Sequence, residues 1–102
     1  MRDNEGVTLE ELRGFKRNEI LKIAASYGVR NVRVFGSVAR GGSTSQSDID
    51  FLVDLVPDRT LMDLGGLRMD LRKALDARVD IATEAMLRPR VREQAARDAV
   101  PL

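Results

Sequence analysis

Two aspartates, Asp48 and Asp50, stand two positions apart in a segment, DIDFLVDLV, that is otherwise rich in Ile, Phe, Leu and Val. Because side chains alternate between the two faces of a β-strand, both carboxylates leave the predicted strand on one side, about 6–7 Å apart at their Cα atoms. Carboxylates that point together repel each other unless a cation lies between them. Oxygen ligands without His or Cys favour a hard cation such as Mg²⁺ or Mn²⁺, whereas a solvated strand face is the alternative explanation of a D-x-D pair alone.

A third carboxylate, Asp80, stands in a second β-branched segment, RVDIA, between Val79 and Ile81. Three carboxylates from two strands of one sheet could converge on a pair of metal ions. Two ions about 3.5–4 Å apart can stabilise both the attacking and the leaving oxygen of an in-line phosphoryl displacement. The three aspartates are therefore the first candidates for a catalytic site.

A turn rich in glycine and serine begins at Gly36-Ser37, directly after the apolar segment Val29–Phe35. Glycines let backbone N–H groups approach a phosphate, the Ser37 hydroxyl adds a donor, and Arg40 adds a bidentate cation. An ordinary surface loop has the same composition, which is the alternative explanation. The stretch is not a P-loop, because Gly42-Ser43 stands where that motif requires Lys-Ser.

Missing residue types exclude several classes of site. The 102 residues include no Cys and no His, which excludes disulfides, zinc ribbons, Ser-His-Asp triads and His-ligated metals. The net charge of +1 provides no steering field. The N-terminus has no apolar stretch of the kind a signal peptide needs, and no segment has the roughly 20 apolar residues of a membrane span. We therefore expect a cytoplasmic protein with no membrane partner.

Hydrophobic periodicity predicts the elements that position these groups. We expect a first helix over about residues 9–27, capped by Thr8 with Glu11 at N3 and stopped by Gly28. Apolar, β-branched runs predict three strands, over residues 29–35, 48–56 and 78–82. Helices are expected near residues 37–40 (one turn), 60–76 and 89–98. The predicted class is α/β (or α+β) in the order α-β-α(short)-β-α-β-α, within a single domain of residues 1–102.

Three features of the predicted helices leave alternatives open. Gly65-Gly66 costs about 2 kcal/mol relative to two alanines inside a helix, so either the helix is weak there or a neighbour packs closely against it. Three methionines suit the core or an adaptable binding face, and the core is favoured because Met is a common gap-filler: Met62, Met69 and Met86. The C-terminal arginines form a solvated face or meet an acidic partner or phosphates: Arg88, Arg90, Arg92 and Arg97.

The joint pattern of Gly36-Ser37, ten further residues, Asp48-x-Asp50 and a later Asp80 resembles the DNA polymerase β-like nucleotidyltransferase superfamily. The stretch FGSVARGGSTSQSDIDFLV is similar to the minimal nucleotidyltransferases of prokaryotes, and the likeness extends over nearly the whole chain. The resemblance implies a small mixed β-sheet flanked by helices, in agreement with the expected element order.

The same resemblance implies a role for each matching residue. Gly36 and Ser37 would hold the β- and γ-phosphates of ATP, and Arg40 occupies the common basic position after them. Asp48 and Asp50 would bind two Mg²⁺ ions, or Mn²⁺. Asp80 would complete the metal site and help to deprotonate the acceptor hydroxyl. The acceptor attacks the α-phosphate and pyrophosphate leaves.

Minimal nucleotidyltransferases resembling this chain act as antitoxins of HEPN-domain RNase toxins. The implied function is transfer of AMP from ATP to a hydroxyl, expected to be a tyrosine of such a toxin. One alternative is nucleotidyl transfer to RNA or a small molecule, although only four aromatic residues offer base stacking and nucleic acid is not expected as a direct partner. The other alternative is a non-catalytic antitoxin that neutralises the toxin by binding.

Overall fold

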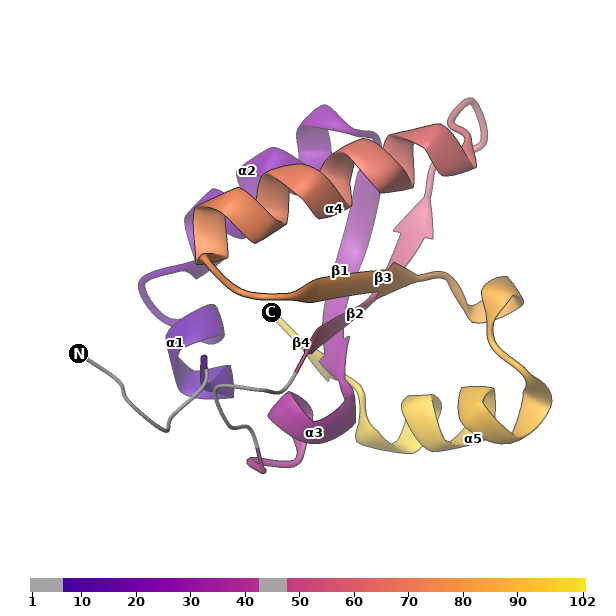
Figure 1. Ribbon diagram of the computed structural model, residues 1–102. Helices are drawn as coiled ribbons and strands as arrows, with labels where there is room; N and C mark the ends of the chain where they lie inside the picture. The colour runs from indigo at the N-terminus through magenta and orange to yellow at the C-terminus, as the bar shows by residue number, and fades with distance from the viewer. Residues whose placement is uncertain (1–6, 43–47) are drawn as a thin grey trace.

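The computed structural model describes residues 7–42 and 48–102, which form a four-stranded mixed sheet with helices packed on it (Figure 1). In chain order the elements are α1 (Leu9–Arg13), α2 (Arg17–Ser26), β1 (Val29–Phe35), α3 (Gly36–Ala39), β2 (Ile49–Leu55), α4 (Leu61–Leu75), β3 (Val79–Ala82), the 3₁₀ turn η1 (Glu84–Met86), α5 (Pro89–Asp98) and β4 (Val100–Pro101). The predicted α/β class is confirmed. The three predicted strands and the helices expected after Phe35, after Thr60 and at Pro89 are confirmed within one or two residues.

The strands lie in the order β3-β2-β1-β4. β2 is antiparallel to β1 and parallel to β3, and the register pairs Phe35 with Asp50 and Asp50 with Asp80. Directly paired residues present their side chains on the same face of a sheet. Phe35, Asp50 and Asp80 therefore form one row across three strands.

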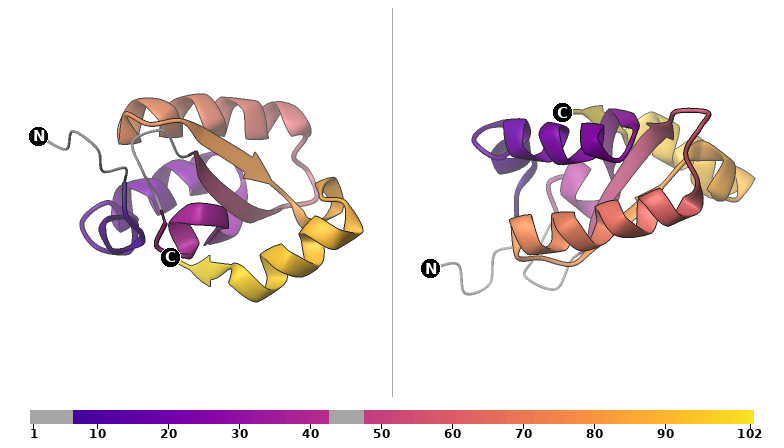
Figure 2. Two further views of the ribbon diagram at one scale, coloured as in Figure 1. Left: turned by 60° about the horizontal axis from the view of Figure 1, so that its bottom comes forward. Right: turned by 90° about the horizontal axis from the view of Figure 1, so that it is seen from above.

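The core lies on the other face of the sheet. Ile49 and Phe51, which flank Asp50, are 1% and 0% exposed, as expected from the alternation of side chains along a strand. They pack under α2 and α4, which lie side by side over that face (Figures 1 and 2), while α3 and α5 lie toward the opposite side. The sheet thus buries its apolar face. The row that contains Asp50 and Asp80, here called the aspartate row, lies on the side of α3 and α5.

The single helix predicted over residues 9–27 is wrong. The chain leaves the helix at Gly14, which has φ −95° and ψ −114°, and resumes it at Arg17. Glycine is about 1 kcal/mol less favourable than alanine inside a helix, so little helix stability is lost when the helix is interrupted at Gly14. Thr8 caps α1 as predicted, accepting a hydrogen bond from the Glu11 N–H at 3.2 Å, and Gly28 follows α2 with φ +70°.

A short C-terminal strand was not predicted. Val100–Pro101 pairs with β1, the Leu102 N–H donates to the Val32 carbonyl at 3.1 Å, and the Arg17 side chain donates to the Leu102 carbonyl at 2.9 Å. A two-residue strand that contains proline has no propensity signal of its own, so only its partner strand creates it.

The methionines favoured for the core are on the surface instead: Met62, Met69 and Met86 are 86%, 57% and 51% exposed. Leucines fill the buried stripe of α4 without them: Leu64, Leu67, Leu71 and Leu75. In the part of the chain that the structure describes, no helix has both the length and the apolar composition needed to cross a membrane.

Close packing explains one glycine of the Gly65-Gly66 pair. A Cβ at Gly66 would lie 2.6 Å from the Tyr27 ring, whereas a Cβ at Gly65 would have nothing within 4 Å. The Tyr27 hydroxyl donates a 2.6 Å hydrogen bond to Asp70, which holds the ring over α4. Gly66 therefore lets α2 and α4 approach, and Gly65 serves no such contact.

Gly65→Ala is expected to raise the free energy of unfolding by about 1 kcal/mol, because alanine favours the helix and the new methyl group meets no neighbour. Gly66→Ala is expected to be less stable than Gly65→Ala, since the Tyr27 ring must move and strain its bond to Asp70. Urea unfolding of the two variants beside the wild type measures the difference. Equal stabilisation by both would contradict the close approach of Tyr27 to Gly66.

Candidate active site

Asp50 is the centre of the aspartate row. Its strand neighbour Asp80 lies in register on β3, and Asp48 immediately precedes β2. Asp50 is half-buried, while the side chains of Asp48 and Asp80 are 41% and 50% exposed. The structure thus brings the three predicted carboxylates to one end of β2 and β3.

The environment of Asp50 disfavours its charge. The pKa of this carboxyl is raised from 3.8 to about 6, first because the group is withdrawn from water and then because Asp80 and Asp48 repel its charge. Arg40 acts in the opposite direction. A cation placed among the three carboxylates would relieve this repulsion.

The raised pKa predicts a stability gain for Asp50→Asn in metal-free protein. The folded state binds the Asp50 proton more tightly than the unfolded state, so the ionised carboxylate destabilises the fold. This penalty is complete above about pH 6 and disappears as the pH falls toward 3.8. With allowance for solvent screening, Asp50→Asn is expected to raise the free energy of unfolding by about 1 kcal/mol at pH 7.5. Thermal unfolding in EDTA from pH 4 to 8 measures the effect. A gain that persists unchanged at pH 4 would contradict this origin.

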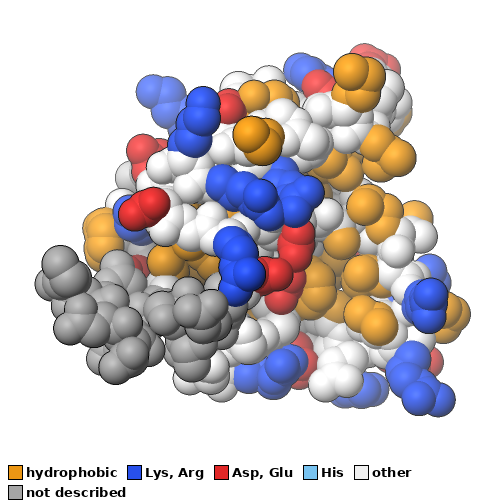
Figure 3. All heavy atoms as spheres, viewed as in Figure 1, with side chains coloured by type: hydrophobic (Ala, Val, Ile, Leu, Met, Phe, Trp, Pro, Cys, Tyr) orange, Lys and Arg blue, Asp and Glu red, His pale blue; other side chains and the backbone are white. Residues whose placement is uncertain are grey.

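Two arginines neutralise the outer carboxylates. Arg78 Nε lies 3.2 Å from Asp48 Oδ1, and Arg68 Nη2 lies 3.3 Å from Asp80 Oδ1. Arg68 is oriented by a further hydrogen bond from its Nε to the Val79 carbonyl, at 3.0 Å. Figure 3 shows acidic side chains flanked by basic ones near the middle of the face that it presents. Exposed ion pairs of this kind contribute only about 0–1 kcal/mol, so a stronger cation can replace them.

The carboxylates fit a divalent metal by their chemistry. All three supply hard oxygen donors, which Mg²⁺ prefers, and burial together with repulsion from Asp80 and Asp48 raises the pKa of Asp50. Within residues 7–42 and 48–102, no three acidic side chains are already gathered closely enough to hold one ion together. Binding would therefore draw Asp48 and Asp80 away from Arg78 and Arg68.

Gly36 lies directly against Asp50. It has φ +75°, a conformation that residues with a side chain rarely adopt, and a Cβ at this position would collide with the Asp50 carboxylate. Ser37 follows in α3, and its carbonyl accepts the Gly42 N–H at 2.9 Å, which closes the turn. The close approach at Gly36 is to the Asp50 carboxylate, and the phosphate-binding role predicted for Gly36 and Ser37 stays a prediction.

Arg40 lies beside the turn, where its Nη1 forms a 3.0 Å ion pair with Asp98 of α5. The sequence did not indicate this partner, which comes from a helix 58 residues further along the chain. Nor did it indicate Arg68 and Arg78 as neighbours of the aspartates. The only available signal was position, since Arg78 stands two residues before Asp80 and faces the same side of the strand.

Comparisons with known proteins identify the family of this chain. The nucleotidyltransferase domain family matches residues 17–102. The chain is 31% identical over 94 residues to the protein adenylyltransferase MntA of Thermococcus cleftensis, covering 92% of this chain and 95% of that protein.

Solved structures share the fold. One that is provisionally described as a minimal nucleotidyltransferase is 47% identical, covers 94% of this chain and 97% of its own, and superposes with a TM-score of 0.81. A toxin–antitoxin crystal structure with AMP-PNP is 22% identical and has a TM-score of 0.72, over 85% of this chain and 72% of its own. The second likeness shows a shared fold alone. By its domain match and these likenesses, the chain belongs to the minimal nucleotidyltransferase family.

Proposed function

We propose that this protein is a protein adenylyltransferase that acts as the antitoxin of a HEPN-domain RNase toxin, transferring AMP from ATP to a tyrosine hydroxyl of that toxin. One observation carries the proposal: Asp50 lies in register with Asp80 while Gly36 lies directly against its carboxylate. The turn proposed to hold the donor phosphates and the carboxylates proposed to hold metal therefore meet at one point. The adenylyltransferase named among the relatives supports the same chemistry.

Each residue has a role in the proposed reaction. Asp48, Asp50 and Asp80 would hold two Mg²⁺ ions, which would neutralise charge on the triphosphate and on the departing pyrophosphate. Backbone N–H groups of Gly36 and Ser37, with the Ser37 hydroxyl, would bind the β- and γ-phosphates.

The proposed transfer needs no covalent enzyme intermediate. The acceptor oxygen forms a bond to the α-phosphorus of ATP, the bond from that phosphorus to the bridging oxygen breaks, and pyrophosphate leaves. Asp80 is proposed to take the hydroxyl proton, the role that the family resemblance implies; its side chain is 50% exposed and is therefore accessible to an acceptor. Positioning and electrostatic stabilisation supply most of the rate.

A macromolecular acceptor agrees with the surface beside the site. Three large apolar side chains at the start of α4 and in η1 are more than half exposed: Leu61, Met62 and Met86. Figure 3 shows apolar side chains gathered on one side of the charged cluster. A protein partner that covered them would bring its own hydroxyl close to β3. Flexible methionines suit such a contact.

The test is the intact mass of the HEPN-domain partner after incubation with this protein, ATP and Mg²⁺. A gain of one or more AMP units with wild type, absent with Asp48→Ala, would support protein adenylylation. A matched reaction with RNA in place of the protein tests the alternative acceptor. Co-purification and neutralisation of the partner without any mass change would instead establish an antitoxin that acts by contact alone.

A further inference from the structure

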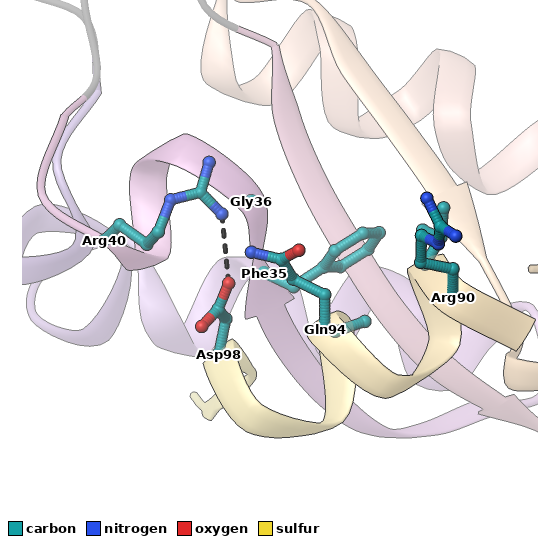
Figure 4. Close-up of a pocket in the computed structure, with 8 residues that line it drawn as sticks. Phe35, Gly36, Arg40, Arg90, Gln94 and Asp98 are labelled. Carbon is teal, nitrogen blue, oxygen red and sulfur yellow. Dashed lines mark hydrogen bonds and ion pairs between the residues drawn. The ribbon is translucent and has the colours of Figure 1, made fainter.

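A pocket of about 330 Å³ opens beside the Gly36 turn, between the end of β1 and α5 (Figure 4). Phe35, Val91 and Ala95 provide its apolar walls, and Arg90 and Gln94 provide polar groups. Its volume falls at the lower end of the range for small-molecule sites, about 300–1,000 Å³. None of the three aspartates lines this pocket, but Gly36 borders both the pocket and Asp50.

The sheet register places this pocket on the catalytic face. Phe35 pairs with Asp50 across β1 and β2, so both side chains leave the same face of the sheet. Gly36 lines the pocket and also lies against the Asp50 carboxylate. A ligand whose phosphates lie at Gly36-Ser37 would therefore have the pocket within reach of its remaining part.

Two polar side chains of the pocket, Arg90 and Gln94, come from one face of α5. Arg90 and Gln94 are four residues apart, and Figure 4 shows both side chains rising from α5, with Gln94 beside Phe35 and Arg90 on the other side of the Phe35 ring. The side-chain amide of Gln94 carries one donor and one acceptor group, which matches the adjacent donor and acceptor on an adenine edge. No carboxylate within residues 7–42 and 48–102 pairs with Arg90, which leaves its charge for an anionic or hydroxylated ligand.

The Arg40–Asp98 ion pair bounds the other end of the pocket. It joins the end of α3 to the last turn of α5 by a 3.0 Å contact. Both residues line the pocket. A partly exposed ion pair therefore links α5 to the turn that is proposed to bind phosphate.

From this arrangement we infer that the pocket binds the adenosine of the nucleotide donor, with the base against Phe35 and Val91 and its edge read by Gln94. The inference rests on the proposed function, because it takes the donor to be a nucleoside triphosphate held at Gly36-Ser37. It assigns nucleotide preference to α5, outside the Gly-Ser and D-x-D motifs. Aromatic and apolar walls accept the face of any base, so Gln94 is the residue that discriminates.

Calorimetric titration of the full chain with ATP, GTP, CTP and inorganic tripolyphosphate, in Mg²⁺, tests the inference. Val91 is 46% exposed, so Val91→Trp can fill the pocket without disturbing the core. Val91→Trp is expected to raise the Kd for ATP about tenfold or more and to leave tripolyphosphate binding unchanged. Gln94→Ala is expected to weaken ATP about three- to tenfold and to reduce the preference for ATP over GTP and CTP. Glu93→Ala, on the exposed side of α5, is the matched control and is expected to bind all four ligands like the wild type.

The outcomes separate this inference from the proposed function. ATP affinity unaffected by both pocket variants, or tripolyphosphate weakened as much as ATP, would overturn the adenosine pocket while leaving transfer to be judged by its own test. The expected binding pattern without any AMP transfer to protein would keep the pocket and overturn the proposed function. A wild type that binds neither ATP nor tripolyphosphate would overturn both. Thermal unfolding of each variant confirms that it is folded.

Discussion

Asp50→Asn is expected to abolish AMP transfer, lowering the rate by at least about 10³-fold. The substitution keeps the shape of the side chain but removes the charge at the centre of the aspartate row, where Asp80 lies in register. The same variant is expected to unfold at a higher temperature in EDTA, because it no longer buries a charge beside Asp80 and Asp48, and burial and this repulsion are the two causes that raise the pKa of Asp50. Activity and stability thus change in opposite directions, as is common where an active site holds charges that destabilise the fold. Initial rates with radiolabelled ATP measure the first effect.

Asp54→Asn is the matched control for this variant. Asp54 stands on the same strand and the same face, but its carboxylate is bound 3.1 Å from Arg33 and receives a hydrogen bond from Asn31. Its loss is expected to leave transfer near the wild-type rate and to cost less than about 1 kcal/mol of stability. If Asp54→Asn were as inactive as Asp50→Asn, the loss would reflect the charge of β2 in general and the assignment of Asp50 would be wrong.

Gly36→Ala is expected to lower transfer by about 10²-fold and stability by about 1–2 kcal/mol. The new Cβ would collide with the Asp50 carboxylate, and alanine is strained at φ +75°. Both effects act on the point where the phosphate turn meets the metal site. Steady-state kinetics and thermal unfolding measure them separately.

Gly41→Ala separates strain from collision. Gly41 has φ +79°, nearly the same as Gly36, but a Cβ there would have nothing within 4 Å. It is expected to lose similar stability through strain and to keep nearly full activity. Equal losses of activity in the two variants would show that the turn conformation, rather than the contact with Asp50, supports the reaction.

Local chemistry explains how much of this protein was predictable. Alternation along DIDFLVDLV places Asp48 and Asp50 on one side and Ile49 and Phe51 in the core, because strand geometry alone dictates the two faces. Proline at the first position starts α5 at Pro89. The Gly-Ser and D-x-D part of the nucleotidyltransferase pattern was recognisable for the same reason, since those residues lie close together in sequence. The roles of these residues in binding metal and nucleotide stay predictions, as does the single domain of residues 1–102.

Tertiary structure decided the rest, because each remaining feature joins segments far apart in the chain. The register of β3 on β2 brings Asp80 beside Asp50, and it is the sum of many contacts that no short window contains. Tyr27 explains Gly66, and β1 creates β4, although neither partner is visible locally. The pairing of Arg40 with Asp98 and the pocket against α5 likewise exist only once the helix returns to the sheet. Sequence alone therefore determined which side chains could do the chemistry, and packing determined which of them meet.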